Sequence, residues 1–164
     1  MTQSPCCIYN GYNDDGGTIM KRISSRFSVA VHILLLVHRY PMLTSEEIAG
    51  SVNTNPAFIR KIQSKLKKAG LIDVRPGVGG TYLLKDVDDI TLLDVYHAVE
   101  VVEQNELFHF HEHPNPNCEV GAHVESVFRS HVRKAQLAME KELARTTLKE
   151  LTEELGKKIS ADSC

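Results

Sequence analysis

The stretch that decides the fold is LTSEEIAGSVNTNPAFIRKIQSKLKKAGLI, residues 43–72. It contains two helix starts. Thr44 is followed three residues later by Glu47, which is the spacing of a capping box. Asn55 suits an N-cap, and Pro56 suits the first helical position. The second helix is predicted over residues 55–69, because Gly70 provides a C-terminal stop. Two helices joined by so short a turn predict a helix-turn-helix.

The second of these helices has two faces of opposite chemistry. Its buried side is predicted to carry Ile59, Ile62, Leu66 and Ala69. At about 100° per residue, its outward side carries Ala57, Arg60, Lys61, Ser64, Lys67 and Lys68. Arginine can bind guanine through two hydrogen bonds, a small side chain admits a thymine methyl, and lysines contact phosphates. This pattern favours DNA binding, although a cationic outer face also simply keeps a helix soluble.

The next segment, LIDVRPGVGGTYLL at residues 71–84, predicts a strand, a tight turn and a second strand. A hairpin in this place forms a wing, here over residues 75–82, and Arg75 at its base could enter a minor groove. We therefore expect a mainly α fold with a small β-hairpin wing. The predicted DNA contacts are Ser25, Arg26, Thr44, Asn55, Ala57, Arg60, Lys61, Ser64, Lys67, Lys68, Arg75, Thr81 and Tyr82.

A length of 164 residues indicates one domain, or one domain plus an attached element, and a hydrophobic content of 42% is enough for a packed core. Residues 23–86 hold nine Lys and Arg against four Asp and Glu, whereas residues 87–164 hold eight against fifteen. The basic first half indicates an anionic partner for that half. Four scattered cysteines without a CxxC pair indicate neither a disulfide framework nor a zinc ribbon, and we expect a cytoplasmic protein.

Two N-terminal features need separate interpretation. Residues 1–19 combine turn formers with no periodicity, so we expect a disordered extension. Gly16-Gly17 shortly before Met20 suggests a translated ribosome-binding sequence, with Met20 as the natural start. The apolar run 29–37 contains His32 and is too short to span a membrane. It is typical of a buried amphipathic helix, with Phe27, Val31, Leu34, Leu35 and His38 near one face.

The second half predicts a linker and two helices. Thr91 caps a short helix within the linker and loop segment 91–120. A long helix follows over residues 121–145, about 40 Å at the usual rise, which is more than a small domain needs. Such a helix either forms a dimer interface or folds back on its own domain. Its apolar stripe, the predicted dimer interface, is Val124, Phe128, Val132, Ala135, Met139 and Leu143.

The last helix of the segment 121–164 begins with a second capping box, Thr147 and Glu150. Its apolar stripe is Leu148, Leu151, Leu155 and Ile159. We expect this stripe to dock on the body or on a partner's reader domain. The end of the chain, SADSC at residues 160–164, is predicted to be frayed.

The segment FIRKIQSKLKKAGLIDVRPGVGGTYLLKDVDDITLLDVYHAVE, residues 58–100, resembles the Rrf-type (Rrf-two) family of bacterial regulators. That family includes the iron–sulfur cluster biogenesis regulator, the nitric-oxide-sensitive repressor and the cysteine-metabolism repressor. The resemblance extends over about residues 20–155, from ISSRFSVAVHILL onward. It implies a winged helix-turn-helix domain over residues 20–90 and a homodimeric repressor of a palindromic operator. The family's base readers fall on Ala57, Arg60 and Lys61. These residues differ from an acidic reader used elsewhere in the family, which implies a different operator sequence.

This sequence departs from the family in two places. Between Arg75 and Tyr82 the wing has one residue more than usual, and Thr81 replaces a common third glycine. The loop that carries three cluster-binding cysteines in some members is LFHFHEHPNPNCEV here, residues 107–120, and keeps only Cys118. Because an iron–sulfur cluster needs about four good ligands, we expect no such cofactor.

Three interpretations of this loop stay open. Zinc or copper could be held by His109, His111, His113, Cys118 and His123. Cys118 alone could act as a thiol sensor, because a helix N-terminus lowers a thiol pKa, although Glu119 opposes this. Alternatively, the loop is a rigid Pro/Asn turn with solvated histidines, and control comes from a regulatory protein or a small-molecule effector.

Three function classes remain. A dimeric transcription regulator that binds double-stranded DNA agrees with most of the features. A winged-helix adaptor between proteins would not require the basic outward face. An enzyme is not expected, because the chain contains no GxSxG, HExxH or phosphate-loop motif.

Overall fold

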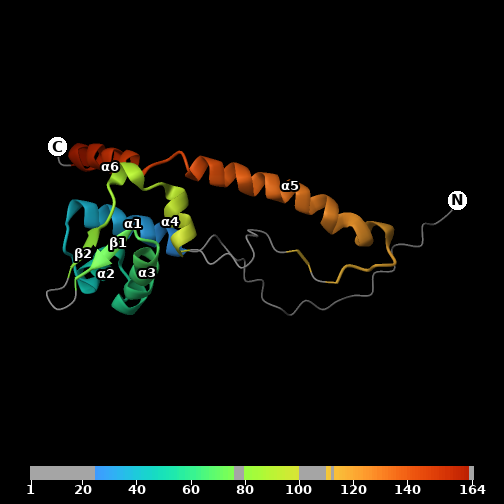
Figure 1. Ribbon diagram of the computed structural model, residues 1–164, viewed down its shortest axis with the longest axis horizontal. Coiled ribbons are helices and arrows are strands. Elements are labelled where there is room, and N and C mark those ends of the chain that lie inside the picture. The colour runs from blue at the N-terminus through green and yellow to red at the C-terminus, as the bar shows by residue number, and fades with distance from the viewer. Residues whose placement is uncertain (1–24, 76–79, 100–109, 112, 163–164) are drawn as a thin grey trace.

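The computed structural model describes residues 25–75, 80–99, 110–111 and 113–162 of the chain (Figure 1). Their order is α1 (Ser25–Arg39), α2 (Ser45–Val52), α3 (Pro56–Lys68), β1 (Ile72–Val74), β2 (Thr81–Leu83), η1 (Val87–Asp89), α4 (Leu92–Val99), α5 (Glu119–Leu143) and α6 (Leu148–Asp162). The fold is mainly helical with one small antiparallel hairpin, as predicted. Residues 1–19 and the tip of the predicted wing lie outside the described residues.

Helices α1 to α4 and the hairpin form one body around a common apolar core (Figure 1). Each of these elements and α6 contributes fully buried side chains, among them Ile33, Ile48, Ile59, Leu66, Ile72, Val95 and Leu148. Burial of one Leu or Ile side chain contributes roughly 1.5–3 kcal/mol relative to its exposure. Leu148 attaches the start of α6 to this core, so this end of the helix docks on the body, which was one of the two predicted alternatives. The predicted docking stripe is confirmed only in part, because Leu151 is half-buried and Leu155 and Ile159 are each 37% exposed.

The predicted buried face of α1 was wrong in part. Leu34 is buried, but the other fully covered positions are Ala30, Ile33 and Val37. His38 is exposed, and Phe27, Val31 and Leu35 are only half-buried. Apolar side chains surround much of this helix, so their spacing did not single out one face. The side that becomes fully covered is determined by the neighbours α2, α3, α4 and β2.

The predicted starts of α2 and α3 are confirmed. The Thr44 backbone N–H donates to Glu47 Oε2 at 2.8 Å, and the Glu47 N–H donates to Thr44 Oγ1 at 3.2 Å. These hydrogen bonds from Thr44 hold the pKa of the Glu47 carboxyl below its usual value. Asn55 Oδ1 accepts from the Phe58 N–H at 2.8 Å. Helix α3 therefore begins and ends where the sequence predicted, within one residue.

The hairpin pairs Ile72 with Leu83 and Val74 with Thr81. A third segment adds to its edge, because the Met42 N–H donates to the Thr81 carbonyl at 2.9 Å and the Thr81 N–H donates to the Leu43 carbonyl at 2.9 Å. Gly80 makes this close approach possible. Its φ is 132°, and a Cβ at this position would lie 2.8 Å from Met42 Cα.

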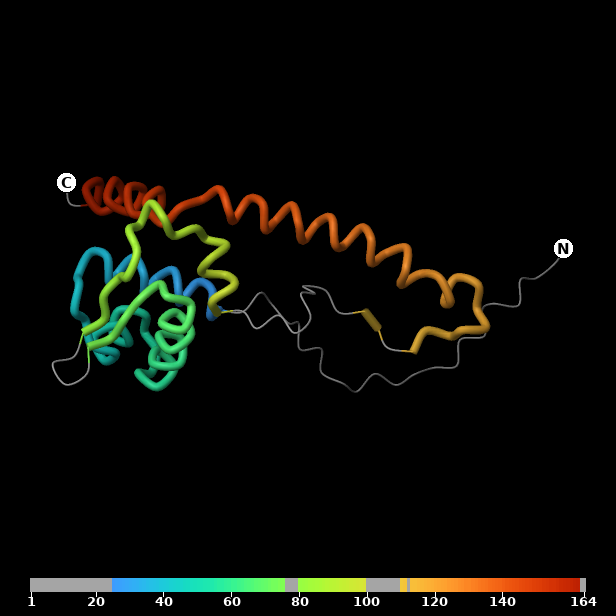
Figure 2. Tube along the Cα trace, in the orientation of Figure 1, coloured from blue at the N-terminus to red at the C-terminus, as the bar shows by residue number. Residues whose placement is uncertain are grey.

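The long helix α5 runs away from the body, with its N-terminal half at the far end (Figure 2). It starts and ends two residues earlier than predicted. Helix α6 returns beside the body, where Lys149 Nζ lies 2.9 Å from Asp88 Oδ1 of η1. Because α6 continues to Asp162, the predicted fraying was wrong for residues 160–162. Among the described helices, none is long and apolar enough to cross a bilayer.

We predict that Gly80→Ala lowers the free energy of unfolding by about 1–3 kcal/mol, because it combines a disfavoured φ with a backbone clash. Gly50→Ala is the matched control, since nothing lies within 4 Å of the added methyl in α2. It should raise stability by roughly 0.5–1 kcal/mol. Urea unfolding followed by circular dichroism measures both. Equal losses in the two variants would contradict the role assigned to Gly80.

Candidate nucleic-acid interface

The outward face of α3 is exposed along its whole length. Ile59, Ile62 and Leu66 are fully buried, which confirms most of the predicted stripe, but Ala69 is exposed because it follows the last helical turn. The residues predicted for the outward side, Ala57, Arg60, Lys61, Ser64, Lys67 and Lys68, are all exposed. Four of these six side chains are cationic. We call this set the reading face.

Two of its cations are paired with carboxylates. Arg60 Nη2 donates to Glu46 Oε1 of α2. Lys67 Nζ lies 2.6 Å from Asp73 Oδ1 of β1. Lys61 and Lys68 have no ion pair within the part of the chain that the structure describes. The reading face therefore contains two constrained and two unconstrained cations, which sequence reasoning did not distinguish.

Asp73 connects the reading face to the base of the wing. The Lys67 side chain and the Val74 N–H both donate to this carboxyl, and they hold the pKa of Asp73 below its usual value. The Tyr82 hydroxyl also donates to Asp73, at 3.3 Å. The Arg75 guanidinium lies 5.3 Å from the centre of the Tyr82 ring, within the range of a cation–π interaction. Arg75 and Lys67 are thus linked through two side chains of the hairpin.

A buried polar network lies behind the reading face. Gln63 is only 4% exposed, and its Nε2 donates to Thr81 Oγ1 at 2.7 Å. Its Oε1 accepts from the Ser45 hydroxyl at 2.8 Å. One side chain of α3 therefore holds the start of α2 and the strand β2. A polar residue between Ile59 and Leu66, on the buried side of the helix, was the signal for this network in the sequence.

The remaining predicted DNA contacts fall in different places. Thr81 is 1% exposed, so its side chain is not available to DNA, contrary to the prediction. Its hydroxyl oxygen instead accepts the hydrogen bond from Gln63. The Thr44 and Asn55 side chains cap α2 and α3. Ser25 and Arg26 are exposed at the start of α1.

A family model described as "Rrf2: Iron-dependent Transcriptional regulator" matches residues 23–154. The chain belongs to the Rrf2 family. This confirms the resemblance seen in the sequence and identifies a family of transcriptional regulators, not of enzymes.

Individual relatives agree with this membership. The chain is 47% identical over 133 residues to a Bacillus subtilis protein named "Putative HTH-type transcriptional regulator YwnA", covering 81% of this chain and 98% of that protein. A crystal structure titled as that of "a putative DNA binding protein" is 42% identical, with a TM-score of 0.64 over 77% of this chain and 98% of that one. The global cysteine regulator CymR of B. subtilis has a TM-score of 0.59 over 82% of this chain and 98% of its own, at 22% identity, and shows the fold alone.

The loop before α5 forms a hydrogen-bonded turn. The Cys118 N–H donates to the Asn115 carbonyl at 3.1 Å, and the Asn117 N–H donates to Asn115 Oδ1 at 3.0 Å. That carbonyl would lie 2.6 Å from a Cβ on Gly121, so the turn requires glycine there. These contacts favour the interpretation of a structural turn, while the thiol-sensor interpretation of Cys118 stays a prediction.

The family description names iron, and the sequence left zinc or copper open at this loop. Among the described residues, no group of three or more His, Cys, Asp or Glu side chains is arranged to hold a metal ion. His111, His113, Cys118 and His123 are therefore not brought together as a ligand set. His109 lies outside the described residues, so the metal alternative that includes it stays a prediction.

Phe110 of this loop packs on α5. Its ring lies 5.8 Å from the Phe128 ring in an edge-to-face arrangement, and the Arg129 guanidinium lies 4.5 Å from its centre. Arg129 is in turn paired with Glu125. The loop thus contacts one residue of the predicted dimer stripe directly.

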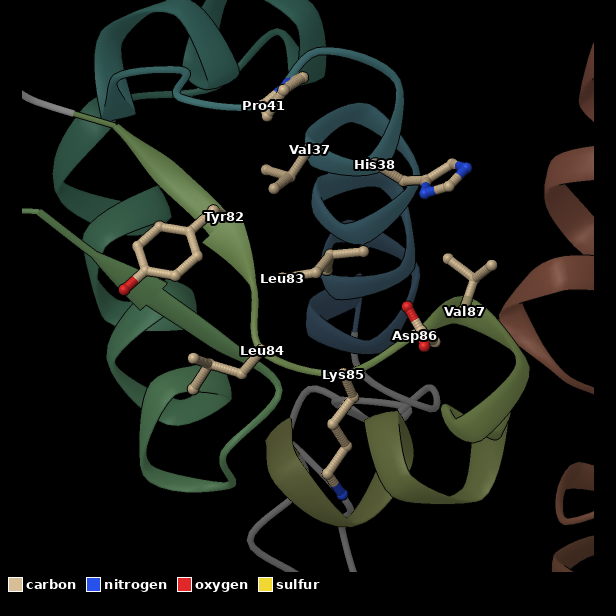
Figure 3. Close-up of a pocket in the computed structure, with 9 residues that line it drawn as sticks. All are labelled: Val37, His38, Pro41, Tyr82, Leu83, Leu84, Lys85, Asp86 and Val87. Atoms are coloured by element: carbon tan, nitrogen blue, oxygen red, sulfur yellow. The ribbon is translucent and has the colours of Figure 1, made fainter.

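A hollow of about 420 Å³ lies on the body, where the end of α1 meets the segment that leaves β2 (Figure 3). His38, Tyr82, Lys85 and Asp86 are its titratable groups, among apolar neighbours such as Val37 and Leu83. Tyr82 belongs both to this hollow and to the base of the wing.

We predict that Gln63→Leu lowers the free energy of unfolding by about 1–3 kcal/mol, because it leaves the buried Thr81 hydroxyl without its partner. Thr81→Val should be destabilising for the converse reason. The double variant should lose less than the sum of the two, since both ends of the bond are then apolar. Denaturant unfolding of all four proteins gives the coupling energy, and strictly additive losses would argue against the network.

Proposed function

We propose that the protein is a cytoplasmic, dimeric transcriptional repressor that binds a palindromic DNA operator with α3 and the wing. The observation that carries this proposal is the reading face, an exposed cationic surface on the second helix of a helix-turn-helix. The names of YwnA and of the 42% identical structure support the DNA-binding part. A repressor of this kind acts by occupying a promoter.

The geometry supports a division of roles on the reading face. Arg60 has the guanidinium geometry for the guanine edge in the major groove, and Ala57 leaves room for a thymine methyl. Lys61 and Lys68, which are unconstrained by ion pairs in the described structure, suit phosphate contacts. Phosphate contacts supply affinity without sequence information and release counterions. Arg75, held on Tyr82, lies at the base of the wing, beside the reading face.

Helix α5 supports the dimer. Val132 of its apolar stripe is 8% exposed, and Met139 and Leu143 are half-buried. Toward the far end of the helix, Val124 and Phe128 of the same stripe are exposed, together with Val120 and Val127. These four are close to one another in angle around the helix. An exposed apolar stripe on a projecting helix is complementary to itself in a two-fold dimer, which would present two reading faces to two half-sites.

We predict that Arg60→Ala weakens binding to the operator by about 1–3 kcal/mol and leaves binding to random DNA nearly unchanged. Lys68→Ala is the matched control, because it removes one charge from the same face without removing a base reader. It should weaken binding to both DNAs alike and reduce the salt dependence by about one counterion.

Fluorescence anisotropy over a range of salt concentrations measures both variants, with a labelled fragment from upstream of the protein's own gene and a random fragment of equal length. Equal losses on the two fragments for Arg60→Ala would show that Arg60 does not read bases. Absence of binding to either fragment by the unaltered protein would favour the adaptor alternative.

We predict that Phe128→Glu converts the dimer to a monomer, because it places a charge in the apolar stripe of α5. Leu137→Glu is the control. Both side chains are 55% exposed, but nine helical positions place Leu137 on the opposite side of α5. Sedimentation equilibrium should show a monomer for the first variant and a dimer for the second. The reverse result would move the interface to the other side of the helix.

A further inference from the structure

Glu46 and Glu47 are consecutive residues at the start of α2, yet their contacts differ. Glu47 is occupied by the capping box, where it accepts from the Thr44 N–H and hydroxyl. Glu46 takes no part in the cap. It is 61% exposed, and its carboxylate accepts from Arg60, which is 58% exposed, across the helix-turn-helix. Glu46 therefore places a negative charge beside a surface that the proposed function assigns to DNA.

Stability does not explain this pair. An exposed ion pair contributes only about 0–1 kcal/mol. A carboxylate beside the reading face also repels phosphates, with an energy on the order of 1 kcal/mol at 4 Å in water. The pair does constrain Arg60. The bond through Nη2 leaves the other guanidinium N–H donors available, and it restricts a side chain that otherwise loses about 2 kcal/mol of rotamer entropy when it is fixed.

We propose that Glu46 is a positioning residue that determines the sequence specificity of DNA binding through Arg60. On the operator, Glu46 holds the guanidinium toward the base edge, so less entropy is lost on binding. On random DNA, the same carboxylate neutralises Arg60 and weakens its attraction to phosphates. Glu46 thus increases the ratio of operator affinity to random-DNA affinity in two ways, by strengthening the first and by weakening the second. This inference rests on the proposed function.

The test compares variants of Glu46 with the unaltered protein by anisotropy on the upstream fragment and on the random fragment. Glu46→Gln should tighten binding to random DNA by about two- to fivefold, which is the loss of one nearby repulsion. It should not tighten operator binding, so the specificity ratio falls by at least about the same factor. Glu46→Asp keeps the charge but shortens the side chain by one methylene group, which weakens the contact with Arg60. It should lower the ratio through weaker operator binding, without tightening binding to random DNA.

Two controls separate positioning from charge and from folding. Asp88→Asn removes the same charge from another exposed ion pair, with Lys149, where η1 meets α6, and should leave the ratio unchanged. In an Arg60→Ala background, Glu46→Gln should no longer lower the ratio. Thermal unfolding should place each glutamate variant within a few degrees of the unaltered protein.

If Glu46→Gln tightened binding to both fragments equally, Glu46 would act only by repelling phosphates, and the inference would be overturned. An unchanged ratio in Glu46→Gln and Glu46→Asp would overturn it as well. Either result leaves the proposed function standing, provided that the unaltered protein prefers the upstream fragment. If the unaltered protein shows no preference, the proposed function fails and the inference fails with it.

Discussion

Helix α3 presents its reading face outward because Ile59, Ile62 and Leu66, on the opposite side of the helix, are held in the core. These three side chains are fully buried against α1, α2 and α4, and their burial determines which residues point outward. Gln63 adds direction to this packing. Apolar contacts alone would tolerate small rotations and translations of α3. The hydrogen bonds from Gln63 to Thr81 and from Ser45 to Gln63 form only when α3 has one orientation relative to α2 and β2. The orientation of the reading face relative to α2 and the wing follows from that constraint.

The carboxylates next to the reading face act differently from those in the helix caps. The Glu47 and Asp94 carboxylates each accept hydrogen bonds from the backbone N–H and the hydroxyl of a threonine three residues earlier, and each stabilises the start of a helix. Burial raises the pKa of Asp94, but the hydrogen bonds from Thr91 outweigh it and lower the pKa overall. Glu46 and Asp73 are instead bonded to cations of the surface. They reduce its local charge and restrict its mobile side chains, so net charge alone describes this surface poorly.

Local chemistry in the sequence predicted the caps of α2, α3 and α4, the α3 boundaries and the hairpin, because each depends on residues only a few positions apart. Of the capping box predicted at Thr147, the structure has only the bond from the Glu150 N–H to Thr147 Oγ1, at 3.4 Å. The buried face of α1 depended on neighbours that are distant in the sequence. Because apolar side chains lie on several sides of this helix, their spacing alone did not indicate which side would be buried. Thr81 was misjudged for a related reason. It occupies a position in the wing that suggests exposure, but its hydroxyl is buried by Gln63, eighteen residues away. The ion pairs of Arg60 and Lys67 likewise join elements that only the fold brings together.

Phe128 connects the histidine-containing loop to the stripe proposed as the dimer interface. Its ring meets Phe110 edge-to-face, while more than half of the side chain stays exposed. A partner that buries the rest of this ring must therefore pack around Phe110 or displace it. Any change that moves Phe110, whether it begins at the histidines or at the turn near Cys118, would alter the surface offered to the partner. If the proposed dimer forms through this stripe, the loop influences it through packing alone, and a bound metal is not a physical requirement for such coupling.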